Sequence, residues 1–209
     1  MKYLPVGLVL LFALSVCNLS EKFKHGKSTN GSGTSSSSSS GDSGATAEHG
    51  EANQAQLAAL TGGQEVKWER QGMSFKVPAS WKEVTNESKE LTWSSPGSEA
   101  SLIVSISPMG QDFPTDASIK AYYDGAKTRA QNGEVDEVKW VEIDGLKGVE
   151  FREANPEKPD DFRRLQWMAY RKFTGQVQFI NLMLATDGKG FPKHQDAMYG
   201  ILYSSKITH

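Results

Sequence analysis

Residues 163–186 constrain the fold of this chain more than any other stretch of its sequence. Two largely apolar runs, 163–173 and 176–186, flank Thr174 and Gly175. Two β-prone runs around a two-residue break that contains glycine are typical of a β-hairpin. With those two residues as the loop, side-chain alternation places a fully apolar set on one face. This set comprises Leu165, Trp167, Ala169, Ile180, Leu182 and Leu184.

The register of this hairpin follows from the same pattern. A slip of one residue would exchange the two faces and mix polar side chains into the apolar set. We therefore expect Trp167 to lie opposite Leu182 and Leu165 to lie opposite Leu184. The other face is also largely apolar, although a few polar residues dilute it. A hairpin of this kind belongs in the middle of a sheet that is covered on both sides.

A second hairpin is predicted at 135–153, around Asp144 and Gly145, which form a preferred sequence for a tight turn. Pairing across this turn produces one apolar face and one face of matched charges. The apolar face holds Val138, Trp140, Val149 and Phe151, and the charged face pairs Lys139 with Glu150 and Glu137 with Arg152. We expect the charged face to be in water, where each pair contributes only about 0.2–1 kcal/mol. Its pairs would then serve mainly to fix the register.

The remaining elements complete an α+β order. Turn residues at 71–72 and 95–98 separate short strands, and a helix is expected at 115–132, with a second helix near the C-terminus. Gly200 lies inside that last helix at a cost of about 1 kcal/mol relative to alanine, which a close approach to the sheet would explain. Because the strand connections are hairpin-like, we predict a mainly antiparallel sheet with the two helices on one or both faces.

The first 17 residues indicate an export signal. An early lysine precedes an apolar run at 4–16, which is too short to span a bilayer and fits a secretory signal. Leu14-Ser15-Val16-Cys17 resembles the bacterial lipoprotein signal, in which the cysteine is lipidated, and Cys17 is the only cysteine of the chain. Valine before the cysteine departs from the small residue that is usual there. Cleavage after Ser15 with secretion, and an uncleaved anchor, are the alternatives.

Residues 18–63 are expected to form a disordered tether between this signal and a globular domain at 64–209. The serine- and glycine-rich stretch at 30–44 cannot bury enough surface to offset the entropy of ordering it. A short helix over 52–60 is the one element considered within the tether.

The residue inventory argues against several kinds of site. Lysine and arginine number 23 against 25 aspartates and glutamates, so no basic excess points to a nucleic-acid partner. One cysteine, and four histidines without zinc spacing, leave no disulfide framework and no zinc cluster. The chain has no phosphate-loop or nucleophile-elbow motif. We therefore expect neither an enzyme active site nor a cofactor.

One acidic loop is retained as a candidate ligand site. Glu157, Asp160 and Asp161 lie close together in the polar segment 154–162. Their oxygens suit a calcium ion, but the spacing lacks the alternating ligands of a dedicated calcium loop, so a solvated acidic loop is the competing interpretation. The arginines at 163–164 and the Arg171-Lys172 pair are interpreted as charges at strand ends that limit aggregation.

A family resemblance rests on motifs in a fixed order. Phe75-x-Val77-Pro78-x-x-Trp81 follows a short strand, a helix covers 116–132, and Ile143-Asp-Gly-x-x-Gly148 forms the turn of a long hairpin. Together with a closing helix, these features resemble the PsbP-like family, which includes small bacterial lipoproteins, over about residues 64–207. The resemblance implies an α/β/α sandwich around an antiparallel sheet, and a non-enzymatic role in binding or assembly.

The sequence thus favours a non-catalytic interaction domain on the cell envelope, anchored in the membrane by a lipid on Cys17 and working with a protein partner. The first alternative is a small-molecule or metal carrier whose site lies between the sheet and the loop at 154–162. The second is a hydrolase whose residues meet only in the fold.

Overall fold

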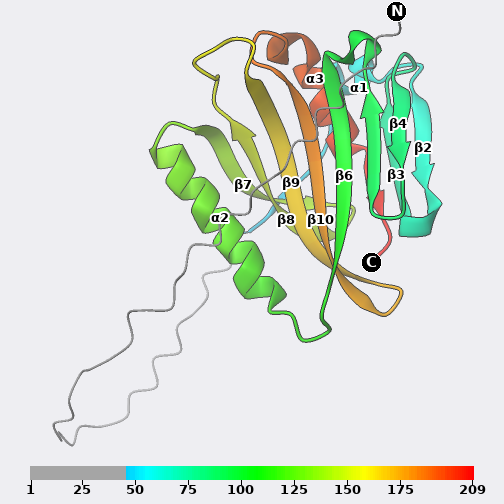
Figure 1. Cartoon of the computed structure of the whole chain (residues 1–209), viewed down its shortest axis with the longest axis vertical. Helices are drawn as coiled ribbons and strands as arrows, with labels where there is room; N and C mark the ends of the chain where they lie inside the picture. Colours follow the sequence, from blue (N-terminus) through cyan, green and yellow to red (C-terminus); the bar gives the residue numbers. More distant parts are fainter. Residues whose placement is uncertain (1–45) are drawn as a thin grey trace, which may run out of the picture. The chain divides into compact units, whose positions relative to one another are not determined.

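The computed structural model describes residues 46–209, whose strands form two sheets with helices packed against them (Figure 1). The larger sheet comprises β1 (Glu48–His49), β4 (Lys82–Asn86), β5 (Glu90–Ser94), β6 (Ala100–Met109), β7 (Val135–Ile143), β8 (Leu146–Glu153), β9 (Phe162–Phe173) and β10 (Gln176–Asp187). The smaller sheet comprises β2 (Gln64–Trp68), β3 (Met73–Val77) and β11 (Lys206–Ile207). The helices are α1 (Gln54–Ala59), α2 (Thr115–Gln131) and α3 (Phe191–Tyr203), with short 3-10 turns η1 (Glu69–Gln71) and η2 (Pro96–Ser98).

The strand order of the larger sheet is β1-β7-β8-β9-β10-β6-β5-β4, and that of the smaller sheet is β11-β3-β2. All these neighbours are antiparallel except β1 and β7, which are parallel. The α+β class with a mainly antiparallel sheet is therefore confirmed. The strands β2 and β3, on either side of the turn at 71–72, form a separate sheet with β11 and do not continue the single sheet that we expected.

The β9–β10 hairpin lies in the middle of the larger sheet, with the expected register. Trp167 is opposite Leu182 and Leu165 is opposite Leu184. All six residues of the apolar set have no measurable exposure. The loop residue Thr174 has φ 49° and the glycine after it φ 78°, the two positive values that a type I′ turn requires.

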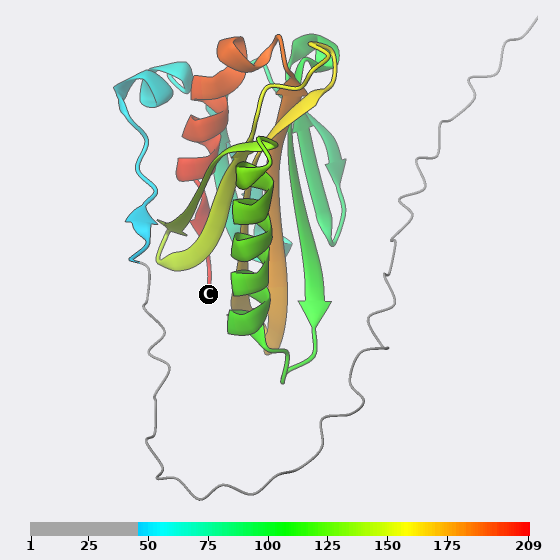
Figure 2. The same cartoon turned by 90° about the vertical axis from the view of Figure 1, so that its left-hand side faces the viewer.

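Helices α2 and α3 lie on opposite faces of the larger sheet (Figures 1 and 2). Trp167 and its neighbours on one face share a core with α3 and the smaller sheet. Met168, which alternation turns to the other face, packs with Ala126 of α2 and Phe151 of β8. The helix α2 contacts β7, β8 and β9, so this second face is covered over part of its width.

The ordered domain begins before residue 64, where the sequence placed its start. The strand β1 pairs with β7, and α1 packs against α3. Asn53 and Gln56 form a reciprocal capping box, in which each side-chain oxygen accepts from the backbone N–H of the other residue, at 2.9 and 3.0 Å. This cap stabilises a six-residue helix that is too short to be stable alone.

The close approach expected at Gly200 is made to α1 instead of the sheet. A Cβ atom there would lie 2.7 Å from the backbone oxygen of Gln56 and 3.1 Å from Leu60. Glycine at this position therefore allows α1 and α3 to pack closely. Within residues 46–209, no helix is long and apolar enough to cross a membrane. The signal-like segment with Cys17, and most of the tether, lie outside the described residues.

Candidate functional site

The charged face of the β7–β8 hairpin is enclosed, which corrects the expectation that it is in water. The register is as expected, with Lys139 opposite Glu150 and Glu137 opposite Arg152. However, the side chain of Glu150 is only 1% exposed. Two segments that are distant in sequence cover it: α3 and residues 48–53, which we call the strap.

The strap is held to the edge of β7 by backbone pairing. Glu48 is in register with Val141 and His49 with Glu142, and the N–H of Gly50 donates to the carbonyl of Glu142 at 2.8 Å. A Cβ atom on Gly50 would lie 2.9 Å from the ring of Tyr203. The absence of a side chain therefore lets the strap lie directly against α3.

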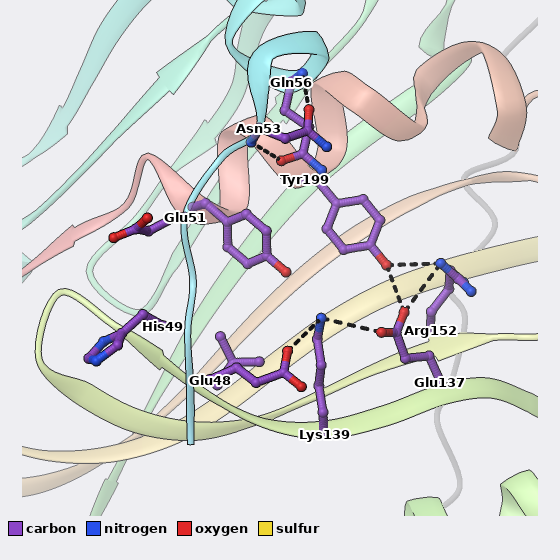
Figure 3. Close-up of a pocket in the computed structure, with 11 residues that line it drawn as sticks. Glu48, His49, Glu51, Asn53, Gln56, Glu137, Lys139, Arg152 and Tyr199 are labelled. Carbon is purple, nitrogen blue, oxygen red and sulfur yellow. Dashed lines mark hydrogen bonds and ion pairs between the residues drawn. The ribbon is translucent and has the colours of Figure 1, made fainter. Parts of the chain in front are cut away.

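A cavity of about 310 Å³ lies between the strap, the β7–β8 hairpin and α3 (Figure 3). It is lined by Glu48, His49, Glu51, Asn53, Gln56, Glu137, Lys139, Val141, Arg152, Tyr199 and Tyr203. In Figure 3, Glu48 points toward Lys139, whereas His49 and Glu51 lie on the other side of the strap. The alternation of an extended segment accounts for this, because successive side chains point in opposite directions.

Lys139 is the central cation of the cavity. Its Nζ lies 3.3 Å from Glu137, 3.5 Å from Glu48 and 3.5 Å from Glu150. The hydroxyl of Tyr203 donates to Glu150 at 3.0 Å. One ammonium group thus joins β7, β8 and the strap, and α3 reaches the same carboxylate through a tyrosine.

Arg152 occupies the other end of the cavity. Its Nη1 lies 3.3 Å from a carboxylate oxygen of Glu137 and donates to the hydroxyl of Tyr199 at 3.2 Å. The Tyr199 hydroxyl donates in turn to Glu137 at 3.4 Å. The Nε of Arg152 is buried without a hydrogen-bond partner and lies 3.7 Å from Asp136. Asp136 itself is held by Arg163 at 2.5 Å.

Burial and negative charge together raise the pKa values in this cavity. Burial raises the pKa of Glu150 to about 7 against the opposing attraction of Lys139. Burial, as the larger cause, and the Glu150 carboxylate, as the next, raise the pKa of Tyr199 to about 12. The same two causes, in the same order, raise the pKa of Tyr203.

The two cations of the cavity also have raised pKa values. Burial lowers the pKa of Lys139, but the carboxylates of Glu150 and Glu137 outweigh it, and the net pKa is raised. Burial likewise opposes the charged form of Arg152, and interactions with Tyr199, Glu137 and Asp136 again raise its pKa. Because desolvation alone would lower both values, the neighbouring carboxylates and Tyr199, and not burial, set the direction of these two shifts.

The acidic loop that the sequence singled out lies elsewhere. Glu157, Asp160 and Asp161 are exposed in the segment between β8 and β9, and Asp160 pairs with Lys189. Within residues 46–209, no three His, Cys, Asp or Glu side chains are grouped so that they could hold a metal ion. The structure does not bring these three residues into the cavity. Cys17, the expected lipidation site, lies outside the described residues.

Two arginines interpreted as exposed strand-end charges are in fact buried. Arg163 is 7% exposed, and Arg171 is 3% exposed. Arg171 donates to Gln178 at 2.9 Å, to the carbonyl of Thr208 at 2.9 Å and to the carbonyl of Gln71 at 2.7 Å. Burial lowers the pKa of Arg171 to about 10. Gln178 lies opposite Arg171 in the same hairpin, but Gln71 and Thr208 are distant in sequence, so local sequence could not reveal these two acceptors.

The strap and the tyrosines of α3 were not predicted from the sequence as parts of a site. The Lys139–Glu150 and Glu137–Arg152 pairs were predicted, but as surface charges. The one local signal for the strap is the charged run Glu48-His49-Gly50-Glu51, which follows the serine- and glycine-rich stretch at 30–44.

No protein-family model and no curated protein matches this chain. Among solved structures, LpqN of Mycobacterium tuberculosis, described as involved in cell envelope biogenesis, matches with a TM-score of 0.51 and 12% identity over 70% of this chain and 86% of its own. The cyanobacterial PsbP protein CyanoP of Synechocystis matches with a TM-score of 0.45 and 14% identity over 69% of this chain and 92% of its own.

Two further structures belong to the same set of matches. The Ran-binding protein Mog1p of Saccharomyces cerevisiae has a TM-score of 0.41 and 12% identity over 69% of this chain and 95% of its own. A Bacteroides thetaiotaomicron structure has a TM-score of 0.46 and 11% identity, and this chain spans about half, 49%, of its length. Of these four matches, LpqN alone has a TM-score above 0.5, and it shows that this chain shares the fold of LpqN. At these identities the likeness shows the fold alone.

Proposed function

We propose that this chain is a lipoprotein of the cell envelope that carries a non-catalytic, PsbP-like binding domain. The cavity beneath the strap carries this proposal. Its charged side chains hold one another in pairs and present a formed, polar recognition site. The domain would recognise a partner or ligand there without changing it chemically.

The direction of the pKa shifts supports binding over catalysis. A catalytic lysine needs a lowered pKa so that it is neutral, and a nucleophilic tyrosine needs a lowered pKa so that it ionises. In this cavity the pKa values of Lys139 and Tyr203 are both raised. Glu150, with a pKa of about 7, has the value of a general base, but it is 1% exposed and held by Lys139 and Tyr203.

The proposed location of the protein in the cell envelope comes from the sequence. The apolar run at 4–16 and the lipoprotein-like ending at Cys17 support export and lipidation. The description of LpqN, which names cell envelope biogenesis, agrees with a location in the cell envelope. Two or more acyl chains at Cys17 would anchor the chain stably, whereas a single chain gives marginal binding.

Lipidation is tested by comparing the full-length protein with Cys17→Ala in a detergent-partition experiment. We expect the wild-type protein to enter the detergent phase and the variant to remain in the aqueous phase. Equal partition of the two proteins would remove the lipid anchor from the proposal, and the binding domain would then be tested by purification alone.

The binding role is tested by gentle affinity purification of the full-length protein from its own membranes, with identification of both proteins and small molecules. We expect a stoichiometric companion in the wild-type preparation that is reduced in Glu48→Gln, whose side chain is 66% exposed and points into the cavity. Glu157→Gln, in the exposed acidic loop, is the matched control and should retain it. A companion retained equally by both variants would place the binding surface elsewhere, and turnover of a retained compound would contradict the non-catalytic assignment.

The second candidate function is that of a small-molecule carrier. The volume of the cavity, about 310 Å³, favours it, because this lies at the lower end of the range for pockets that bind small organic molecules. The site would then be beneath the strap and not beside the loop at 154–162. A recurrent small molecule without a protein companion, in the same purification, would favour this candidate.

A further inference from the structure

We propose that the cavity beneath the strap binds a small organic molecule through a primary ammonium group, which lies between Glu48 and Glu137. This inference rests on the proposed binding role, in its small-molecule form. It assigns the charge and the size of the ligand, neither of which follows from the fold.

The balance of charge in the cavity favours a cation. Glu48 and Glu137 line the cavity together with the two cations Lys139 and Arg152, and the buried Glu150 beside it is a third carboxylate paired with Lys139. Arg152 is also engaged from outside by Asp136. One further positive charge would therefore be attracted in this partly enclosed site, whereas a negative group would be repelled.

The carboxylates retain capacity to accept hydrogen bonds. Lys139 Nζ lies 3.3 to 3.5 Å from its three carboxylates, which exceeds the roughly 2.7–2.9 Å of a direct charge-assisted hydrogen bond. The side chain of Glu48 is 66% exposed, and its ion-pair partner among the described residues is Lys139. A second ammonium group can thus approach the same oxygens from the open side.

The size and aromatic lining of the cavity limit the rest of the ligand. A volume of about 310 Å³ suits a molecule of on the order of ten non-hydrogen atoms. The rings of Tyr199 and Tyr203 line it, with centroids 5.7 Å apart and planes inclined by 41°. Aromatic faces attract organic cations, so the two rings would add to the attraction of the carboxylates.

Binding of a cation should be linked to the ionisation of Glu150. Lys139 of β7 and Tyr203 of α3 contact this carboxyl, and Glu137 of β7 and Tyr199 of α3 interact with it electrostatically. Glu48 of the strap and Arg152 of β8 are linked to it through Lys139 and Glu137. Because burial raises the pKa of Glu150 to about 7, it is largely protonated below that pH. A bound ammonium group favours the ionised carboxyl, so affinity for the ligand should increase as the pH rises through about 7.

The test uses the full-length protein and three probes that differ in one end group: 5-aminopentan-1-ol, pentane-1,5-diol and 5-hydroxypentanoate. Binding is followed by calorimetry and by NMR shifts of the strap. We expect saturable binding of the amine, at least about tenfold tighter than that of the diol, and weaker binding still of the carboxylate. The amine should bind more tightly at about pH 8 than at about pH 6, and Glu150→Gln should remove this pH dependence.

Two variants separate a local site from a general charge effect. Glu48→Gln should weaken amine binding by about tenfold or more, whereas Glu157→Gln, which removes the same charge from the exposed loop, should leave it unchanged. Equal loss in both variants, equal affinity for amine and diol, or no saturation by the amine would overturn the proposal. Tighter binding of the carboxylate would also overturn it. In each of these cases, a companion found in the membrane purification would still support the binding role.

Discussion

The two long hairpins of the larger sheet obey the same pairing rule and bury opposite kinds of side chain. Both turn through two residues with positive φ, Thr174 and Gly175 in one and Asp144 and Gly145 in the other. The β9–β10 hairpin buries an apolar face in the main core. The β7–β8 hairpin buries a face of matched charges beneath the strap and α3.

This difference separates the part of the domain that provides stability from the part that we propose for recognition. Burial of apolar surface stabilises the fold by about 25 cal/mol per Å², so the β9–β10 hairpin is a large source of stability. Enclosing Glu150 carries a desolvation cost that the attraction of Lys139 only partly offsets. A costly, charged site held on a rigid sheet is typical of a binding site, because stability and function often make opposing demands.

The largest effect is expected in the apolar hairpin. Trp167→Ala should lower the free energy of unfolding by about 3–5 kcal/mol, because it empties a fully buried position. Phe162→Ala on the same strand is the control. Since that side chain is 76% exposed, it should change stability by no more than about 0.5 kcal/mol. Chemical denaturation measures both, and similar losses would contradict the assigned core.

The next largest effect is expected from Glu150→Gln and depends on pH. At pH values well below 4.5 the Glu150 carboxyl is protonated in both the folded and the unfolded chain, so the substitution should have little effect. Between pH 4.5 and about 7 the unfolded chain ionises this group whereas burial keeps it protonated in the folded chain, so wild-type stability falls over this range and stays low above the folded pKa. At about pH 8 the variant should therefore be more stable than wild type, by up to about 3 kcal/mol.

The matched control for this prediction is Glu157→Gln in the exposed loop, which should show no comparable change between the two pH values. Denaturant unfolding across the pH range measures the difference between the variants. A loss of stability in Glu150→Gln at about pH 8 would show that the attraction within the ion pair outweighs desolvation, which is the opposite of the expected balance.

A smaller effect with opposite signs is expected at two helical glycines. Gly200→Ala should destabilise the domain by about 1–3 kcal/mol, because its Cβ would press on the backbone of Gln56. Gly125→Ala on α2 should stabilise it by about 0.4–1 kcal/mol, because a Cβ there meets nothing within 4 Å. Gly200→Ala should also speed amide hydrogen exchange in the strap. Equal effects would mean that α1 is not packed against α3.

The smallest effect is expected on the outer side of the strap. His49→Ala removes an ion-pair partner of Glu142 at 3.4 Å, but the histidine side chain is 75% exposed. We expect a change of at most about 0.5 kcal/mol in the free energy of unfolding. Thermal unfolding at low and high salt measures this. A loss of several times that size would indicate that the strap is held by its outer face and not by the cavity.

The sequence was sufficient for the registers of both hairpins, because cross-strand pairing depends on neighbours in the chain. Trp167 opposite Leu182, and Lys139 opposite Glu150, both follow from alternation around a tight turn. The helices α2 and α3 were also predictable from their apolar stripes and end signals. The structure explains why residue 148 of the family motif is a glycine, because a Cβ atom there would lie 2.6 Å from the indole of Trp167.

The environment of the charged face could not be predicted from local pattern. Whether Glu150 is in water depends on the strap and on Tyr203, which lie far from it in the sequence on either side. The strap belongs to a segment whose composition indicates disorder, and backbone pairing with β7 together with one capping box orders it. The buried position of Arg171 was missed for the same reason, because its acceptors Gln71 and Thr208 come from the two ends of the domain.

The most direct test of the enclosed charged face is an NMR titration of the Glu150 carboxyl in the full-length protein, with the signal assigned through Glu150→Gln. We predict a midpoint at about pH 7, because burial raises the pKa of this group from 4.5. A midpoint near 4.5 would show that the carboxyl is solvated and that the strap and α3 do not enclose it.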